Sequence, residues 1–183
     1  MSEYGFQGMP NLETLEKVIQ KEDLNFTSEA FKNHQKHPTG FETINEYMAR
    51  DFPVPKSLEK YNYVSQILQA YGMKTAIEAH RLAKPYCMGS LYWQLNDCWP
   101  VTSWSTLDYY GNWKASHYQV KESFAPTLLM VTEITNGLSI IGSNDNLEVQ
   151  KGTLNAKLID FSGKELWTAS KECELNSEIN TNC

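Results

Sequence analysis

The sequence has 183 residues, of which 41% are hydrophobic and 21% charged, and its 22 acidic residues outnumber 16 basic ones for a net charge of −6. A chain of this length buries roughly 70% of its extended surface, so the composition predicts a core without metal or disulfide staples and disfavours disorder. The acidic balance and the scattered basic residues argue against nucleic acids and membrane surfaces as partners, and no apolar stretch approaches the about 18 residues of a membrane-spanning helix. Residues 1–10 also lack the basic and apolar regions of a signal peptide.

The first two thirds of the sequence predict helices joined by short loops, because apolar residues recur there at helical spacing. Four helices are expected before residue 84: one capped by Asn11 and running through Ile19, one starting at Thr27 or Ser28 and ending before His37, one at 41–50, and a long one at 57–83.

A different pattern begins after Pro85. Residues 86–93 form a short, nearly continuous apolar run, which predicts a strand covered on both faces as in a parallel sheet. A polar, aromatic-rich loop at 94–112 and a helix at 113–124 follow. This order of helix, strand, loop and helix predicts a βα repeat.

Beyond Pro126 the helical period disappears. Strands are expected at 127–132, 138–142, 153–160 and 165–173, with the turn residues of hairpins at 136–137, 143–146 and 162–163 and a polar tail at 174–183. The sequence thus predicts an α/β part up to about Ala125 and the beginning of an antiparallel β domain after it.

The loop after the predicted strand 86–93 combines aromatic rings with carboxamides and carboxylates: Trp93, Asn96, Asp97, Trp99, Trp104, Asp108, Tyr109 and Tyr110. Such a set suits a sugar, whose C–H face stacks on a ring while its hydroxyls need fixed donors and acceptors. Tryptophan residues that only pack in the hydrophobic core would give the same sequence pattern. In a (β/α)8 barrel, however, a loop after a strand lies at the catalytic face.

Outside that loop the chemical signals are weaker. Glu3 lies among aromatic and amide neighbours, where it fits either a nucleophile or general base, or a solvated end residue. His34 and His37 have the spacing of a metal pair, but without a third ligand in register a surface helix end is favoured. The four cysteines, which are far apart and form no CxxC pair, predict no zinc or redox motif: Cys87, Cys98, Cys173 and Cys183.

Two long blocks carry a family resemblance. Residues 2–10 read SEYGFQGMP and residues 89–100 read GSLYWQLNDCWP, and both resemble the β-mannosidases of glycoside hydrolase family two. The resemblance implies the C-terminal portion of a (β/α)8 TIM barrel at 1–126 and the start of an antiparallel Ig-like β-sandwich at 127–183. It also implies a retaining exo-glycosidase that removes terminal β-D-mannose from oligosaccharide or glycan substrates.

The resemblance further assigns roles to single residues. It implies that Glu3 is the nucleophile and that Trp93 lines the pocket for the terminal mannose, with Asn96, Asp97 and Trp99 as further substrate-binding candidates. Asn96 and Asp97 fit equally well as hydroxyl partners and as groups that brace the loop. No part of the chain corresponds to the family's acid/base Glu, so the chain alone is expected to be inactive.

The resemblance implies no metal and no organic cofactor, and it is compatible with a homodimer of the complete enzyme and with a periplasmic, secreted or lysosomal location. Two alternatives remain open. One is an exo-β-glucosaminidase of the same family, and the other is a non-catalytic carbohydrate-binding fragment.

Overall fold

The computed structural model describes residues 1–183 and divides them into two units. The first unit comprises residues 1–77 and 89–123, and the second comprises residues 78–88 and 124–183. The long helix α4 (Leu58–Leu82) contributes residues to both units. The domain boundary expected after residue 126 stays a prediction.

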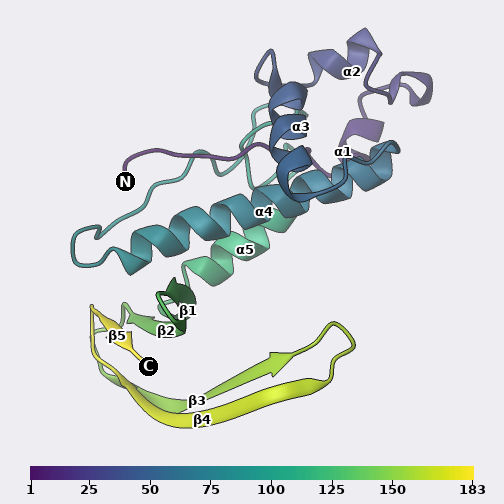
Figure 1. The fold of residues 1–183 in the computed structure, drawn as a ribbon. Coiled ribbons are helices and arrows are strands. Elements are labelled where there is room, and N and C mark those ends of the chain that lie inside the picture. The colour runs from purple at the N-terminus through teal and green to yellow at the C-terminus, as the bar shows by residue number, and fades with distance from the viewer. The chain divides into compact units, whose positions relative to one another are not determined.

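The helices expected from the sequence are confirmed, with small changes at their ends (Figure 1). Besides α4, the first unit holds α1 (Leu12–Glu16), the 3-10 turn η1 (Lys21–Asp23), α2 (Glu29–Asn33), α3 (Gly40–Asp51) and α5 (Ala115–Ser123). Helix α1 is shorter than expected. The amides of Val18 and Ile19 both donate to the Leu15 carbonyl, so the chain leaves the helix in a turn that buries Ile19 and exposes Val18.

The core of the first unit lies where α1, α2 and α3 meet α4. Its centre is a set of aromatic rings, in which Phe31 stacks on Phe41 at 5.1 Å between centroids and Phe26 meets both rings edge-on. Such tilted and edge-to-face pairs add to the free energy of area burial. The remaining buried members are Met9, Leu15, Ile19, Ile44, Met48, Tyr61 and Leu68.

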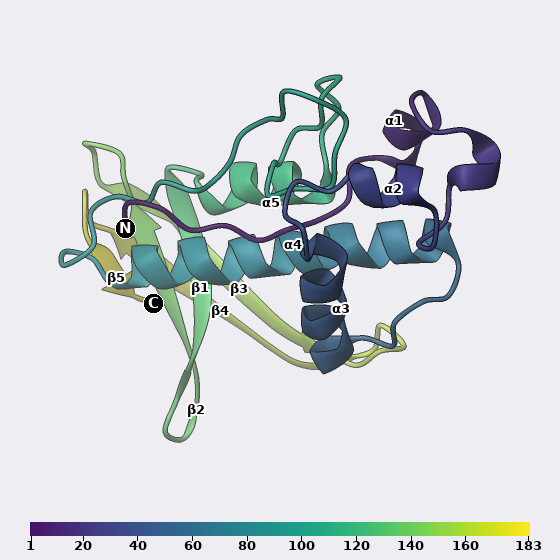
Figure 2. The same cartoon turned by 90° about the horizontal axis from the view of Figure 1, so that it is seen from above.

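A second, smaller cluster joins α4 to α5, which lie side by side in both views (Figures 1 and 2). Met73 and Ile77 of α4 pack against Val120 of α5, with Tyr4 and Phe6 of the N-terminal segment at the edge. The N-terminal segment is therefore anchored to α4 by its aromatic residues.

The expectation of a fully buried strand at 86–93 is wrong. These residues form no regular strand, and the side chains of Met88, Leu91 and Trp93 are exposed. A few backbone hydrogen bonds from this segment reach residues 1–4 along one edge. They are too few to build a ladder, so the apolar run is extended without becoming part of a sheet.

The second unit contains two antiparallel sheets. A three-stranded sheet has the order β1-β2-β5, and a two-stranded sheet pairs β3 with β4. The bounds are β1 (Thr127–Ile134), β2 (Gly137–Asn144), β3 (Gln150–Ile159), β4 (Glu165–Leu175) and β5 (Asn180–Asn182). The expected strands are confirmed, and the polar tail contributes the short β5.

The connection between β2 and β3 differs from expectation, because the two strands belong to different sheets and do not form a hairpin. The buried side chain of Asn144 explains the change of direction. Its amide donates to the carbonyls of Glu148 and Leu175 at 2.9 and 3.1 Å, and its oxygen accepts from the Asn146 backbone. The polar run therefore fixes a corner between sheets, whereas the turns at 135–136 and 160–164 do close hairpins.

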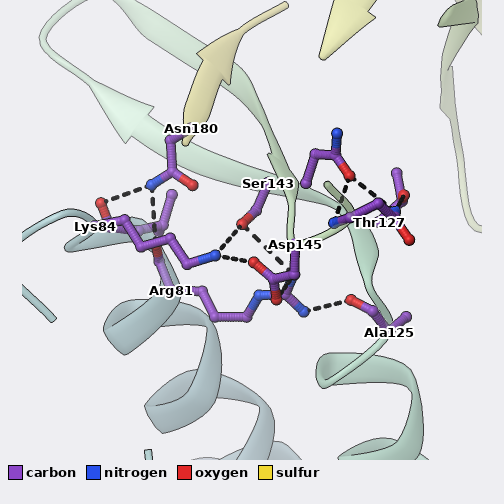
Figure 3. A network of polar contacts seen from close by, with 10 residues as sticks. Arg81, Lys84, Ala125, Thr127, Ser143, Asp145 and Asn180 are labelled. Atoms are coloured by element: carbon purple, nitrogen blue, oxygen red, sulfur yellow. Dashed lines mark hydrogen bonds and ion pairs between the residues drawn. The ribbon is translucent and has the colours of Figure 1, made fainter. Parts of the chain in front are cut away.

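A polar network inside the second unit joins the last turn of α4 to the strands (Figure 3). Buried Arg81 donates to the Ala125 carbonyl at 2.6 Å and to the Asp145 carboxylate at 3.1 Å. Lys84 forms an ion pair with the same carboxylate, and the Asn180 amide donates to the Arg81 carbonyl at 2.9 Å. The network ties the helix end to β2 and β5.

None of the helices combines the length and the hydropathy needed to cross a lipid bilayer.

Candidate active site

The segment that carries Glu3 is extended and lies beside the segment that carries Trp93. The Met1 amino group donates to the Gly89 carbonyl at 2.9 Å, and the Leu91 amide donates back to Met1 at 3.1 Å. Met1 thus bonds to the residues on either side of Ser90, as in a pair of parallel strands. The Trp93 amide adds a 2.6 Å bond to the Tyr4 carbonyl, directly after Glu3, one residue out of the register that the first two bonds set.

Glu3 and Trp93 are both accessible. Glu3 is exposed, and Trp93 is 48% exposed although its backbone amide is hydrogen-bonded. The structure thus places these two predicted site residues on neighbouring, hydrogen-bonded backbone segments.

Gly5 allows the Glu3 segment to lie close to the backbone of Trp93. A Cβ atom at Gly5 would lie 2.2 Å from the Trp93 carbonyl oxygen and 3.0 Å from a ring carbon of Trp104. A residue with a side chain would push the two segments apart, so glycine at this position is required by the packing.

Asp97 lies in the interior of the tryptophan loop (residues 93–106). Its side chain is almost completely buried, and one carboxylate oxygen accepts hydrogen bonds from the hydroxyls of Ser103 and Ser105. The other oxygen accepts from Gln94 Nε2 at 3.0 Å and from Lys36 Nζ at 3.1 Å. With four donors on one carboxylate, the geometry favours the loop-bracing alternative for this residue.

Asp108 plays a similar part in the turn that follows. It is buried, accepts from the backbone amides of Tyr110 and Asn112 at 3.0 and 2.9 Å, and is also contacted by the Thr14 hydroxyl. Gly111 closes this turn with a φ of 81°, a conformation that suits glycine.

Lys114 is fully buried close to these two carboxylates. Its Nζ donates to the Gly8 carbonyl at 2.9 Å. Burial lowers the pKa of Lys114 to about 7, and the nearby Asp97 and Asp108 oppose that change. Burial also lowers the pKa of His117, whose Nδ1 lies 2.9 Å from the Thr106 hydroxyl.

The other two predicted site residues lie farther along the same loop. Asn96 is exposed, and Trp99 is half-buried with its ring 5.7 Å from that of His34. Neither has a contact to Glu3 among the hydrogen bonds and ring contacts of the structure. They extend the exposed polar and aromatic surface that begins at Trp93.

Sequence reasoning missed Lys114 and Gln69. Gln69 is fully buried on α4, and its amide reaches the backbone of both the Glu3 segment and the tryptophan loop. A signal existed in the spacing of Ser65, Gln69 and Met73, which places two polar residues on the buried face of the helix. For Lys114 no comparable signal existed, because a lysine next to an aromatic residue is normally solvated.

The chain is similar to known proteins along nearly its whole length. Residues 136–183 match the family model of a Mannosidase Ig/CBM-like domain. The β-mannosidase of Capra hircus is 35% identical over 180 residues, and β-mannosidase A of Aspergillus oryzae is 29% identical over 190 residues. These alignments cover 91% and 90% of this chain.

Solved structures of glycosidases are also similar to this chain. A crystal structure of β-D-mannosidase from Dictyoglomus thermophilum covers 100% of this chain with a TM-score of 0.92 and 36% identity. An exo-chitosanase from Amycolatopsis orientalis shares the fold at a TM-score of 0.78 but only 18% identity.

The chain spans about a fifth of the length of these relatives, covering 20% of the Capra hircus protein and 23% of the Dictyoglomus thermophilum chain. Over nearly all of its own residues it is aligned with β-mannosidases. By these similarities the chain resembles part of a β-mannosidase of glycoside hydrolase family two.

Proposed function

We propose that this chain is part of a retaining exo-β-mannosidase that hydrolyses terminal, non-reducing β-D-mannose residues. The observation that supports the proposal is the hydrogen bond from the Trp93 amide to the Tyr4 carbonyl, which joins the backbone next to the exposed Glu3 to that of the partly exposed Trp93 in a chain aligned with β-mannosidases. The substrate class is a β-mannoside oligosaccharide or glycan.

Glu3 is the proposed nucleophile. In a retaining glycosidase two carboxyl groups about 5–5.5 Å apart divide the work: one attacks the anomeric carbon and the other, protonated, assists the departing oxygen. Attack by Glu3 forms a glycosyl ester and breaks the glycosidic bond, and water then hydrolyses the ester with the second carboxyl as base. We assign the second carboxyl to a part of the enzyme outside residues 1–183, because the chain spans only about a fifth of its relatives.

Trp93 is the proposed platform for the terminal sugar. Its half-exposed ring offers a flat apolar face that can fix the sugar ring relative to Glu3. Asn96 and Trp99 are proposed to contact substrate farther from the reacting carbon. Asp97 is proposed to hold the loop in shape, since its carboxylate already accepts four hydrogen bonds.

We also propose that residues 1–126 are the C-terminal portion of a (β/α)8 barrel and that residues 127–183 begin an Ig-like sandwich. The parallel hydrogen-bond pattern around Met1 and the packing of α4 against α5 support the first assignment. The two antiparallel sheets and the match to a Mannosidase Ig/CBM-like domain support the second.

A substitution of Glu3 tests the function in the enzyme that carries this chain. Glu3→Gln keeps the shape of the side chain but removes its charge, so turnover of 4-nitrophenyl β-D-mannoside should fall by roughly 10³-fold or more while mannose still binds. Glu29→Gln, at an exposed surface pair, is the matched control and should stay within twofold of wild type.

The results that count against the proposal are distinct. Near-normal activity of Glu3→Gln would exclude Glu3 as the nucleophile. Wild-type enzyme that hydrolyses the β-D-glucosaminide much faster than the β-D-mannoside would replace the proposed substrate with that of an exo-β-glucosaminidase.

A further inference from the structure

Two buried polar side chains join the segment that carries Glu3 to the tryptophan loop. The first is Gln69 of α4. Its Nε2 donates to the carbonyl of Phe6 at 2.8 Å and to those of Trp104 and Ser105 at 3.2 and 3.1 Å. One amide group therefore contacts both segments at once.

The second is Lys114, which contacts the same junction from the beginning of α5. Its Nζ donates to the Gly8 carbonyl at 2.9 Å, and Gly8 also exchanges backbone hydrogen bonds of 2.9 and 3.3 Å with Ser103. The Gly8–Ser103 bridge is the point at which the two segments pair, and Lys114 lies directly on it.

The packing leaves Gln69 no freedom to move. Its Oε1 accepts a hydrogen bond from the Ser116 hydroxyl at 3.1 Å, so both ends of the amide are bound. A Cβ atom at Gly8 would lie 2.5 Å from that Oε1 and 3.0 Å from the Gln69 Cβ. Gln69 and Lys114 are also 0% exposed, so water cannot take over their hydrogen bonds.

We propose that Gln69 and Lys114 are positioning residues that hold the Glu3 segment in register with the tryptophan loop, and so fix the distance between the nucleophile and the Trp93 platform. This inference rests on the proposed function of Glu3 and Trp93. Neither residue touches the reacting atoms. They act through the backbone at Phe6 and Gly8, and a misplacement of about 1 Å can reduce a catalytic rate by roughly 10²-fold.

The substitutions Lys114→Met and Gln69→Met test the proposal in the enzyme that carries this chain. Each keeps the length of the side chain and removes its donors. Turnover of 4-nitrophenyl β-D-mannoside should show kcat lowered by roughly 10- to 100-fold with KM within threefold, because positioning matters most in the transition state. Hydrogen exchange at the amides of Gly8 and Ser103 should also become faster.

Arg81→Met is the matched control. It removes a buried cation that likewise donates to a backbone carbonyl, that of Ala125, but within the second unit. It should lower the melting temperature and leave kcat within twofold of wild type.

The outcomes separate the inference from the function on which it rests. The inference is overturned if Lys114→Met and Gln69→Met keep the wild-type kcat. It is also overturned if they lose no more kcat than Arg81→Met does at an equal loss of stability. If wild-type enzyme itself shows no mannosidase activity, the proposed function fails. Exchange at Gly8 and Ser103 then decides the inference alone, because unchanged exchange in the variants overturns it. If Lys114→Met does not fold, Gln69→Met carries the same test.

Discussion

The buried amine of Lys114 costs free energy that its surroundings offset only in part. Burial disfavours the charged form, whereas the carboxylates of Asp97 and Asp108 favour it. The resulting pKa of about 7 lies well below the roughly 10.4 of a lysine in an unfolded chain. The Gly8 carbonyl is contacted in either protonation state, because a neutral amine is still a donor.

This pKa difference predicts how stability depends on pH. Between about pH 7 and pH 10 the unfolded state binds a proton at Lys114 that the folded state has lost, so the free energy of unfolding should rise with pH across that window. In Lys114→Met that contribution is absent. Denaturant unfolding of both proteins from pH 7 to 10 should therefore show a growing advantage of wild type over the variant.

The exposed Lys32 provides the comparison, because Lys32→Met should run parallel to wild type across the same range. Parallel curves for Lys114→Met as well would mean that the folded pKa of Lys114 is not depressed.

For single residues, the sequence predicts which ones belong to the candidate site better than it predicts how deeply each is buried. Glu3 and Trp93 were singled out from their motifs, and the structure places their backbones side by side. Asp97 was found as a polar loop residue, but only folding shows that its carboxylate is turned inward. The burial of Lys114 was beyond prediction, since it depends on the Gly8 carbonyl, which comes from a distant part of the chain.

Among the secondary-structure elements, the end of α4 is joined to the strands by ion pairs to Asp145, and these predict a measurable effect on stability. The buried Arg81 and the partly buried Lys84 share this one carboxylate, which is itself partly exposed. Removing the carboxylate takes away the counter-charge that the two cations share, and breaking such a pair is more costly than breaking one at the surface.

Asp145→Asn should therefore destabilise the second unit by about 1–3 kcal/mol, a reduced range because solvent reaches Asp145. Glu165→Gln, which breaks the exposed Lys157–Glu165 pair on the β3–β4 hairpin, should cost less than about 1 kcal/mol. Hydrogen exchange of the β1 and β2 amides measures both. Equal effects of the two substitutions would show that the ion pairs to Asp145 add nothing.

Helices were easier to predict than strands for a physical reason. A helix satisfies its own hydrogen bonds, so spacing and caps at residues such as Ser28 define α2, α3, α4 and α5 almost from the sequence alone. A strand depends on partners. The apolar run at 86–93 has too few partner hydrogen bonds to become one, and β2 and β3 separate because the buried Asn144 bonds β4 instead of closing a hairpin.

At the scale of the whole molecule, both units expose large apolar side chains. The β3–β4 hairpin of the second unit exposes the apolar side chains of Leu158, Phe161 and Trp167. Within the first unit, the exposed aromatic residues include Trp93 of the tryptophan loop and, farther along the chain, Trp113, whose ring lies 4.8 Å from that of Tyr118 between centroids. Aromatic rings that are held in place but accessible are the kind of surface that sugars bind.

Covalent labelling of the complete enzyme tests the proposed role of Glu3 as the nucleophile. A 2-deoxy-2-fluoro mannoside with a good leaving group slows both steps of a retaining reaction, and the activated leaving group lets the first step outrun the second. The glycosyl-enzyme should accumulate in the enzyme that carries this chain. Mass spectrometry should then find the added sugar on the peptide containing Ser2, Glu3 and Tyr4, and a label on any other carboxylate would contradict the account.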